Sequence, residues 1–259
     1  MIIGGLQKFT LIDYPDKIAA VVFLAGCNFR CPFCHNPELV KARLIASLPQ
    51  ISEKEFFKFL KSRQGDLDGI SFTGGEPTLN LELPDFIKRI KKLGFLVKVD
   101  TNGSNPEMVK KLTAEKLVDY WAMDIKTALE KYNLAIGAEK NMGNKDAQNE
   151  IEGAQNFVSL QENLEKSIKL ITDSGVDYEW RTTMAPTIVD KNDILKIIKW
   201  LNKIDPDALK NASRYTLNQF RPGKTLDPDF EKLNSYSDDE LEKSAALLRP
   251  YCRKVIVLS

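Results

Sequence analysis

Short apolar runs alternate with amphipathic segments along most of the chain. The runs carry apolar side chains at consecutive positions, which is typical of strands buried on both faces of a parallel sheet. They cover residues 18–24, 70–72, 95–99, 120–125, 178–182, 215–220 and 255–258. Between them, apolar side chains recur every three to four residues, which is the spacing of an amphipathic helix. Six strands alternating with helices, and a short terminal strand, predict an α/β fold with right-handed crossovers.

Helix-capping residues indicate where several of these helices begin. Ser52, Ser159 and Ser237 each precede a glutamate at the spacing of a capping box. Asn105, followed by a proline, predicts the start of another helix. The pattern is compatible with an open doubly wound sheet and with a partial barrel, so both architectures stay open at this point.

Two segments depart from this alternation. Residues 1–16 contain short β segments around Gly4-Gly5 and predict an N-terminal β extension, formed as a hairpin ahead of the main fold. Residues 133–157 form a polar insertion that is longer than the usual loop of a compact domain. Their composition favours a solvated or partly disordered insertion over a partner-docking element.

The overall composition argues against several classes of protein. Apolar residues at 43% and charged residues at 28% are ordinary for a soluble globular chain, so 259 residues suffice for one large core or two small domains. A net charge of +1 gives no sign of a nucleic-acid or membrane partner. No apolar run approaches the roughly 18–20 residues of a membrane span, and the N-terminus does not resemble a secretory signal. We therefore expect a cytoplasmic protein in a reducing environment.

Three of the four cysteines and the only histidine lie in one short stretch. Cys27, Cys31 and Cys34 are spaced so that three thiolates can face one inorganic cluster. An iron–sulfur cube takes four ligands, so this stretch would leave one iron open to a substrate or cofactor. A structural zinc site would need a fourth close ligand, and the histidine directly follows one of the cysteines. A disulfide would need an oxidising compartment, and we expect Cys252 to be a partly buried free thiol.

The cysteine spacing C-x-x-x-C-x-x-C, with Phe33 between the last two cysteines, resembles the signature of the radical S-adenosylmethionine (radical SAM) enzymes. Residues 4–15 and 26–37 also resemble the activating proteins of anaerobic ribonucleoside-triphosphate reductase. The resemblance implies a single-domain partial (β/α)6 barrel with a mainly parallel sheet and the cluster at its C-terminal mouth. It also implies two cofactors: a [4Fe–4S] cluster with three cysteine ligands, and S-adenosylmethionine at the open iron.

A glycine-rich segment follows the second predicted strand, in the string Thr73-Gly74-Gly75-Glu76-Pro77. By itself it reads as a plain turn, although glycines let backbone approach a ligand and a carboxylate can bind an ammonium group. It resembles the GGEP motif of the family, which implies that Gly74, Gly75 and Glu76 hold the methionine amino group of the cofactor. Phe33 is expected to shield the cluster or to stack near the adenine.

Residues at the ends of the later strands complete the cofactor site that the resemblance implies. Asp100 and Asn102 follow the third strand, where turn capping is the alternative to binding the ribose hydroxyls. Lys126 follows the fourth strand, where a solvated charge is the alternative. Arg181 lies in the fifth strand, where a structural salt bridge competes with bidentate pairing to the cofactor carboxylate. Gln219 ends the sixth strand and is the last expected contact.

The same resemblance implies an activity. The reduced cluster would cleave S-adenosylmethionine, and the 5′-deoxyadenosyl radical would take a hydrogen atom from a glycine of anaerobic ribonucleoside-triphosphate reductase or of another glycyl-radical protein. A flavodoxin- or ferredoxin-type protein would supply the electron. Pyruvate formate-lyase activators carry a cofactor-contacting histidine near the position of Gln219, which this chain lacks, whereas residues 219–222 resemble the reductase subgroup. The alternatives are a small-molecule radical SAM enzyme and, more remotely, a non-catalytic metal-binding or electron-transfer protein.

Overall fold

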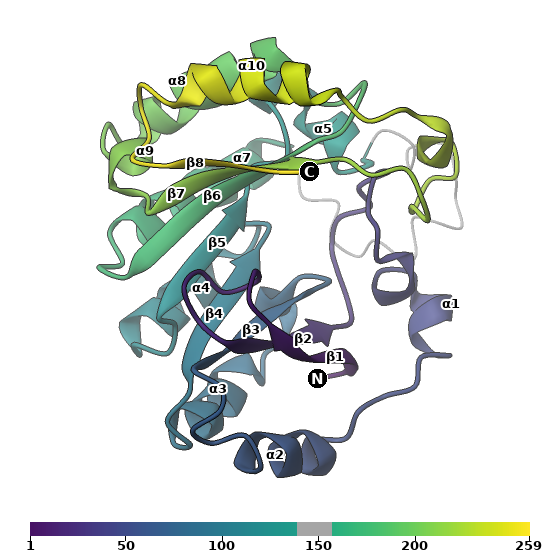
Figure 1. Cartoon of the computed structure of the whole chain (residues 1–259), viewed down its shortest axis with the longest axis vertical. Coiled ribbons are helices and arrows are strands. Elements are labelled where there is room, and N and C mark those ends of the chain that lie inside the picture. The colour runs from purple at the N-terminus through teal and green to yellow at the C-terminus, as the bar shows by residue number, and fades with distance from the viewer. Residues whose placement is uncertain (139–156) are drawn as a thin grey trace.

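A curved sheet of eight strands runs through the molecule, with the strands in the order in which they follow one another along the chain (Figure 1). The structure is a computed structural model, and it describes residues 1–138 and 157–259. β1 is antiparallel to β2, and every later pair of neighbours is parallel. The strands are β1 (Ile3–Thr10), β2 (Ala19–Leu24), β3 (Gly69–Gly74), β4 (Leu96–Thr101), β5 (Tyr120–Asp124), β6 (Asp177–Met184), β7 (Arg214–Gln219) and β8 (Val255–Leu258). Each predicted strand is therefore present, close to its predicted bounds.

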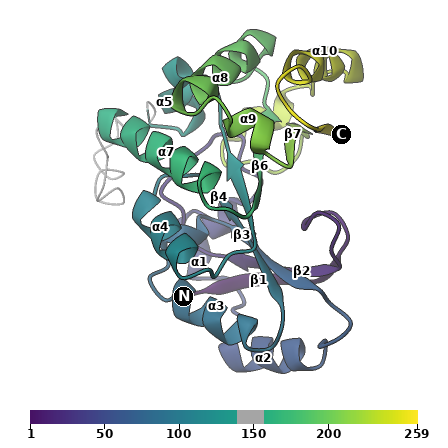
Figure 2. The same ribbon diagram turned by 90° about the vertical axis from the view of Figure 1, so that its left-hand side faces the viewer.

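The helices cover the convex outer face of this sheet (Figures 1 and 2). Along this layer α4 packs against α7, α7 against α8, and α8 against α10. Their apolar faces bury the side chains that the helical spacing predicted, such as Phe86, Ile87 and Ile90 of α3. The helices are α1 (Ala42–Ile45), α2 (Glu53–Lys61), α3 (Leu83–Lys91), α4 (Pro106–Ala114), α5 (Tyr132–Ala135), α7 (Phe157–Thr172), α8 (Lys191–Ile204), α9 (Ala208–Asn211) and α10 (Asp238–Leu248).

Two of the three predicted capping boxes are confirmed. Ser52 and Ser237 each accept a hydrogen bond from the backbone of the glutamate three residues later and begin α2 and α10. The prediction for Ser159 is wrong, because α7 begins at Phe157 and Ser159 lies inside the helix. Phe157 and Val158, the described residues directly before Ser159, include neither glycine nor proline, so they can continue the helix past the capping motif.

The N-terminal extension is one strand rather than a hairpin. β1 lies along β2, with Ile3 opposite Leu24 and Thr10 opposite Ala19. After β1 the chain turns under the N-terminal ends of the strands, where Tyr14 packs against Tyr120 with ring centroids 5.9 Å apart. The extension therefore closes the end of the sheet that lies away from the cysteines.

The first residues of the predicted polar insertion belong in part to the core. Ala135 of α5 and Ile136 are buried in the main core, so the expectation of a solvated segment from residue 133 is wrong for these positions. The rest of the insertion, residues 139–156, lies outside the described residues.

The sheet is curved but open, which confirms the expected α/β partial barrel. Within the described residues, β1 and β8 each pair with one neighbouring strand and form the two edges. The carboxyl ends of the parallel strands face the same side, so the loops after β2, β3, β4 and β5 meet there. No helix in the described part of the chain is both long enough and apolar enough to cross a membrane.

Candidate active site

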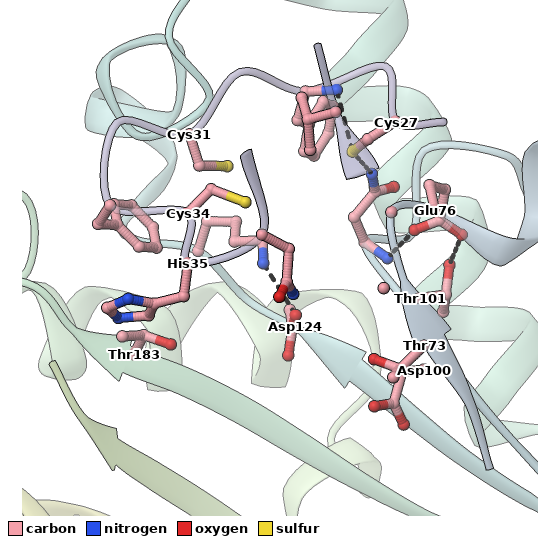
Figure 3. A pocket seen from close by; sticks show the side chains of 18 of the residues that line it. Cys27, Cys31, Cys34, His35, Thr73, Glu76, Asp100, Thr101, Asp124 and Thr183 are labelled. Carbon is pink, nitrogen blue, oxygen red and sulfur yellow. Dashed lines mark hydrogen bonds and ion pairs between the residues drawn. The ribbon is translucent and has the colours of Figure 1, made fainter. Parts of the chain in front are cut away.

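The three cysteines lie on the cluster loop, residues 25–36, which leaves the carboxyl end of β2. Backbone hydrogen bonds hold this loop near its start, from the Gly26 amide to the Leu39 carbonyl (2.8 Å), and at its middle, from the Arg30 amide to the Ile136 carbonyl (2.9 Å). None of the cysteines forms a disulfide. Figure 3 shows the sulfurs of Cys31 and Cys34 on one side of a cavity and the sulfur of Cys27 on the other, all pointing into the space between them.

The chemistry of these donors fits an iron–sulfur cluster better than a single metal ion. Among the described residues, no group of three or more histidine, cysteine, aspartate or glutamate side chains is arranged to hold one ion. In a cube each cysteine binds a different iron, so its three sulfur ligands stand further apart than the ligands of one ion. Burial raises the pKa of the Cys27 and Cys31 thiols to about 12, so a cationic group such as iron is needed to hold them as thiolates.

The glycine-rich segment after β3 lies directly against the cluster loop. The Gly75 amide donates to the Leu24 carbonyl (2.7 Å), and the Glu76 amide donates to the Gly26 carbonyl (2.7 Å). A side chain at Gly75 would place its Cβ 2.7 Å from the Gly26 carbonyl carbon and closer still to the carbonyl oxygen. Gly74 adopts a φ of 106°, which favours glycine. These two positions therefore require glycine, as the motif predicted, and they expose backbone to the cavity.

The Glu76 carboxylate is buried and faces protein donors. It accepts hydrogen bonds from the Thr78 amide (3.1 Å) and hydroxyl (2.6 Å), from the Thr101 hydroxyl (2.8 Å) and from the Asn102 amide (2.6 Å). Burial outweighs these hydrogen bonds and raises the pKa of the carboxyl group above its ordinary value. Glu76 thus ties the glycine-rich segment to the end of β4, a role that the sequence did not indicate.

A second polar network ties the cluster loop to the residues after β4. The Asn102 amide nitrogen Nδ2 donates to Asn28 Oδ1 (3.0 Å), and Asn28 Nδ2 donates to the Ser104 hydroxyl (2.8 Å). Asn102 Nδ2 also lies 4.0 Å from the Cys27 sulfur. Asn28 directly follows Cys27, so this network fixes the position of that cysteine relative to the sheet.

The inner face of the sheet carries an ion chain of seven alternating charges. In order these are Lys126, Asp124, Arg181, Asp100, Lys98, Glu179 and Arg214. The Arg181 guanidinium lies 2.8 Å from both Asp100 and Asp124, and the Lys126 ammonium lies 2.8 Å from Asp124. Strand register produces two of the contacts, because Arg181 stands opposite Asp124 and Arg214 stands opposite Glu179. The ion chain runs from Lys126, Asp124, Arg181 and Asp100, of the cavity wall, to Lys98, Glu179 and Arg214, which lie outside it.

The charged side chains of the ion chain shift one another's pKa values. Burial alone would raise the pKa of the Asp124 carboxyl, but Arg181 and Lys126 outweigh it and hold that pKa well below its usual range. The pKa of Asp100 is lowered in the same way, by Arg181 and Lys98 against burial. Burial lowers the pKa of Lys126, but the Asp124 carboxylate outweighs burial and raises it overall. Asp124, Asp100 and Lys126 are therefore charged at neutral pH.

Most of the predicted site residues line one cavity of about 860 Å³, including its open mouth. These are the three cysteines with Phe33, Gly74, Gly75, Glu76, Asp100, Asn102, Lys126 and Arg181. Gln219 does not line it; its amide nitrogen donates to the Tyr236 carbonyl (2.8 Å). The sequence analysis missed other lining residues, including Phe29, Thr73, Asp124 and Thr183. It also missed the charged Lys98, which does not line the cavity but pairs with Asp100 deeper in the ion chain. Lysine in an apolar strand, two positions before Asp100 and so on the same face, was the available signal for Lys98.

Comparisons with known proteins agree with this geometry. The model of the Radical SAM superfamily matches residues 21–201. A Methanocaldococcus jannaschii protein assigned as a glycyl-radical enzyme activating enzyme is 31% identical over 99% of this chain and 95% of its own length. The pyruvate formate-lyase-activating enzyme of Clostridium pasteurianum is 27% identical over 90% of this chain and 86% of its own length.

Solved structures show the same fold at low sequence identity. The crystal structure of Streptococcus suis SuiB matches with a TM-score of 0.62 at 12% identity and covers 92% of this chain. This chain spans 48% of SuiB, so the likeness concerns the shared fold alone. The chain belongs to the radical SAM superfamily, whose members use a [4Fe–4S] cluster and S-adenosylmethionine, and within it to the glycyl-radical enzyme activating enzymes.

Proposed function

We propose that this chain generates the glycyl radical of anaerobic ribonucleoside-triphosphate reductase. The observation that carries the proposal is the convergence of three cysteine sulfurs on a cavity whose other walls hold glycine backbone, three carboxylates and two cations. The choice of this target rests on residues 4–15 and 219–222, which resemble the reductase subgroup, and on the lack of a histidine near Gln219.

In this proposal Cys27, Cys31 and Cys34 each hold one iron of a [4Fe–4S] cluster and leave the fourth iron to S-adenosylmethionine. When bound, these cofactors supply a one-electron reductive cleavage and the hydrogen abstraction that follows it. The chain's own part is to position the reactants and to exclude water. Phe29 and Phe33 are buried beside the cysteines and give that part of the cavity an apolar wall.

The remaining lining residues suit the polar parts of S-adenosylmethionine. Gly74 and Gly75 line the cavity with backbone alone, and their carbonyls suit its ammonium group. Lys126 and Arg181 suit its carboxylate, whereas Asp100 suits the ribose hydroxyls. Asn102 and Glu76 act mainly through the cluster loop and the glycine-rich segment that they hold in place.

The test is electron paramagnetic resonance on the target protein. The reconstituted cluster is reduced anaerobically by a flavodoxin- or ferredoxin-type protein, and S-adenosylmethionine is added with and without anaerobic ribonucleoside-triphosphate reductase. A glycyl-radical doublet that needs both proteins is the expected result. Formation of 5′-deoxyadenosine without a radical on the reductase would contradict this choice of target.

A second target is supported by the similarity to pyruvate formate-lyase-activating enzymes. The same experiment with pyruvate formate-lyase distinguishes the two, since a doublet on that protein alone would reassign the partner. Cleavage of S-adenosylmethionine with no radical on either protein would favour a small-molecule substrate. A verified cluster that gives neither product would point to a non-catalytic role.

A further inference from the structure

A second, larger hollow lies on the other side of the cluster loop. This outer groove encloses about 1490 Å³, including its open mouth. Its apolar lining residues include Pro32, Leu134, Ile188, Leu226 and Phe230. It shares no described lining residue with the cavity that the three cysteines line. The groove therefore plays no part in the site described so far.

The cluster loop itself separates the groove from the cavity. Successive side chains of the loop face opposite sides: Phe29, Cys31 and Phe33 line the cavity, whereas Arg30 and Pro32 line the groove. A molecule in the groove would thus lie one loop thickness from a cluster ligand. It would remain apart from the space where S-adenosylmethionine and the substrate glycine have to meet.

The groove walls are hydrogen-bonded to the same loop. The Leu226 amide donates to the Cys34 carbonyl (2.9 Å), and the Asp227 amide donates to the Pro32 carbonyl (3.0 Å). On the opposite wall, Gly137 lies so close to the backbone of Arg30 that a Cβ would clash with it. These contacts give the groove a fixed position relative to Cys31 and Cys34.

The charges that line the groove are mostly positive. Among the described lining residues, Arg30, Lys41 and Arg43 are basic and Asp227 alone is acidic. The Arg30 guanidinium donates to the carbonyls of Cys27 (2.6 Å) and Phe29 (3.0 Å), which fixes a positive charge beside the loop. Lys41 and Arg43 are exposed and form no ion pair with any described residue. Such uncompensated charge attracts a partner of opposite sign.

We propose that this groove docks a small acidic one-electron carrier protein, which delivers its electron to the cluster through the Cys31 side of the loop. The inference rests on the proposed function, because it assumes a cluster that has to be reduced. In the transfer step the carrier loses one electron and the cluster gains it, with no bond made or broken. The apolar floor supplies contact area, and the basic rim orients the acidic carrier.

The test measures the rate of cluster reduction in rapid-mixing experiments with two reductants. One is a reduced flavodoxin of strongly negative net charge, and the other is photoreduced 5-deazariboflavin, which is small and uncharged. The variant is Lys41→Glu/Arg43→Glu. The matched control is Lys110→Glu/Lys111→Glu, which makes the same change in net charge at two exposed positions of α4.

We expect the groove variant to slow reduction by flavodoxin about tenfold or more at low ionic strength, the usual size of electrostatic steering effects. The control variant and the reaction with 5-deazariboflavin should keep wild-type rates. Leu134→Gln, which leaves every charge in place, should raise the flavodoxin concentration needed for half-maximal reduction. Equal slowing in both double variants, or none in the groove variant, would overturn the proposal.

The outcomes also separate this inference from the proposed function. If the groove variant is reduced normally by flavodoxin but gives less radical on the reductase, the groove serves the target protein and the inference is wrong. If enzyme reduced by 5-deazariboflavin does not cleave S-adenosylmethionine, the proposed function fails, whereas the reduction rates still decide where the carrier docks.

Discussion

Gly75 is the position where the smallest substitution should have the largest effect on the site. An alanine there would place its Cβ 2.7 Å from the Gly26 carbonyl carbon. Carbon atoms in contact normally stay about 3.5–4.0 Å apart, so one backbone segment has to move by roughly 1 Å. The movement would also disturb the hydrogen bond from the Glu76 amide to the Gly26 carbonyl, and Cys27 directly follows that carbonyl. Because displacements of about 1 Å can cost about 100-fold in rate, we expect Gly75→Ala to lose S-adenosylmethionine cleavage on that scale.

The assay compares iron and sulfide content, the resonance spectrum of the reduced cluster, and the rate of 5′-deoxyadenosine formation with a small-molecule reductant. Gly65→Ala is the matched control, because Gly65 has a φ of 87° but no atom lies within 4 Å of an added Cβ. The control should lose roughly 1–2 kcal/mol of stability from its backbone conformation and keep a normal cluster. A Gly75→Ala enzyme with a full cluster and wild-type cleavage would refute the steric reasoning.

Three further predictions test the cluster, the ion chain and the pH dependence of stability. Cys27→Ala should abolish the iron–sulfur absorbance after reconstitution, whereas Cys252→Ala should retain it; the reverse result would contradict the ligand assignment. Glu179→Ala leaves Arg214 without its ion-pair partner and Lys98 with Asp100 alone, and it should lower the free energy of unfolding in urea by about 3–5 kcal/mol. Glu115→Ala, at an exposed ion pair, should cost less than about 1 kcal/mol. The pKa of Asp124 is lowered in the folded state, so its contribution to stability is present above the ordinary carboxyl pKa of about 3.9 and is lost as the pH falls below it. Asp124→Asn should therefore flatten the decline of unfolding free energy below about pH 4, and an unchanged slope would refute the linkage.

The strands were predictable because a strand that is buried on both faces carries apolar side chains at consecutive positions. The apolar runs mark them, and the segments of helical spacing between them mark the crossover helices. Capping motifs were less reliable where the helix could begin at more than one residue. Ser159 carries the capping pattern, yet Phe157 and Val158 directly before it are compatible with a helix and already belong to α7.

The candidate site was predictable as far as its motifs are local in sequence. The cysteine spacing and the two glycines pointed to residues that the structure brings to one cavity. The ion chain was not predictable in this way, because Arg181 meets Asp124 across 57 positions and only strand register brings them together. Gln219 shows that a position at the end of a strand does not determine where the side chain goes. It ends β7 as expected, but its side chain donates to the backbone carbonyl of Tyr236 and does not line the cavity.

The order of the strands has a consequence for biosynthesis. Each strand pairs with its neighbours in the chain, so a nascent polypeptide can add one strand and helix at a time to an edge that already exists. The cysteines leave the ribosome early, whereas Leu226 and Asp227, which hold the outside of their loop, follow roughly 190 residues later, after about 10–40 s of synthesis. During that interval the cluster loop lacks its hydrogen bonds from Leu226 and Asp227. The three thiols are then accessible to the proteins that deliver iron and sulfide. We expect cluster insertion to be easiest before the C-terminal third of the chain has folded.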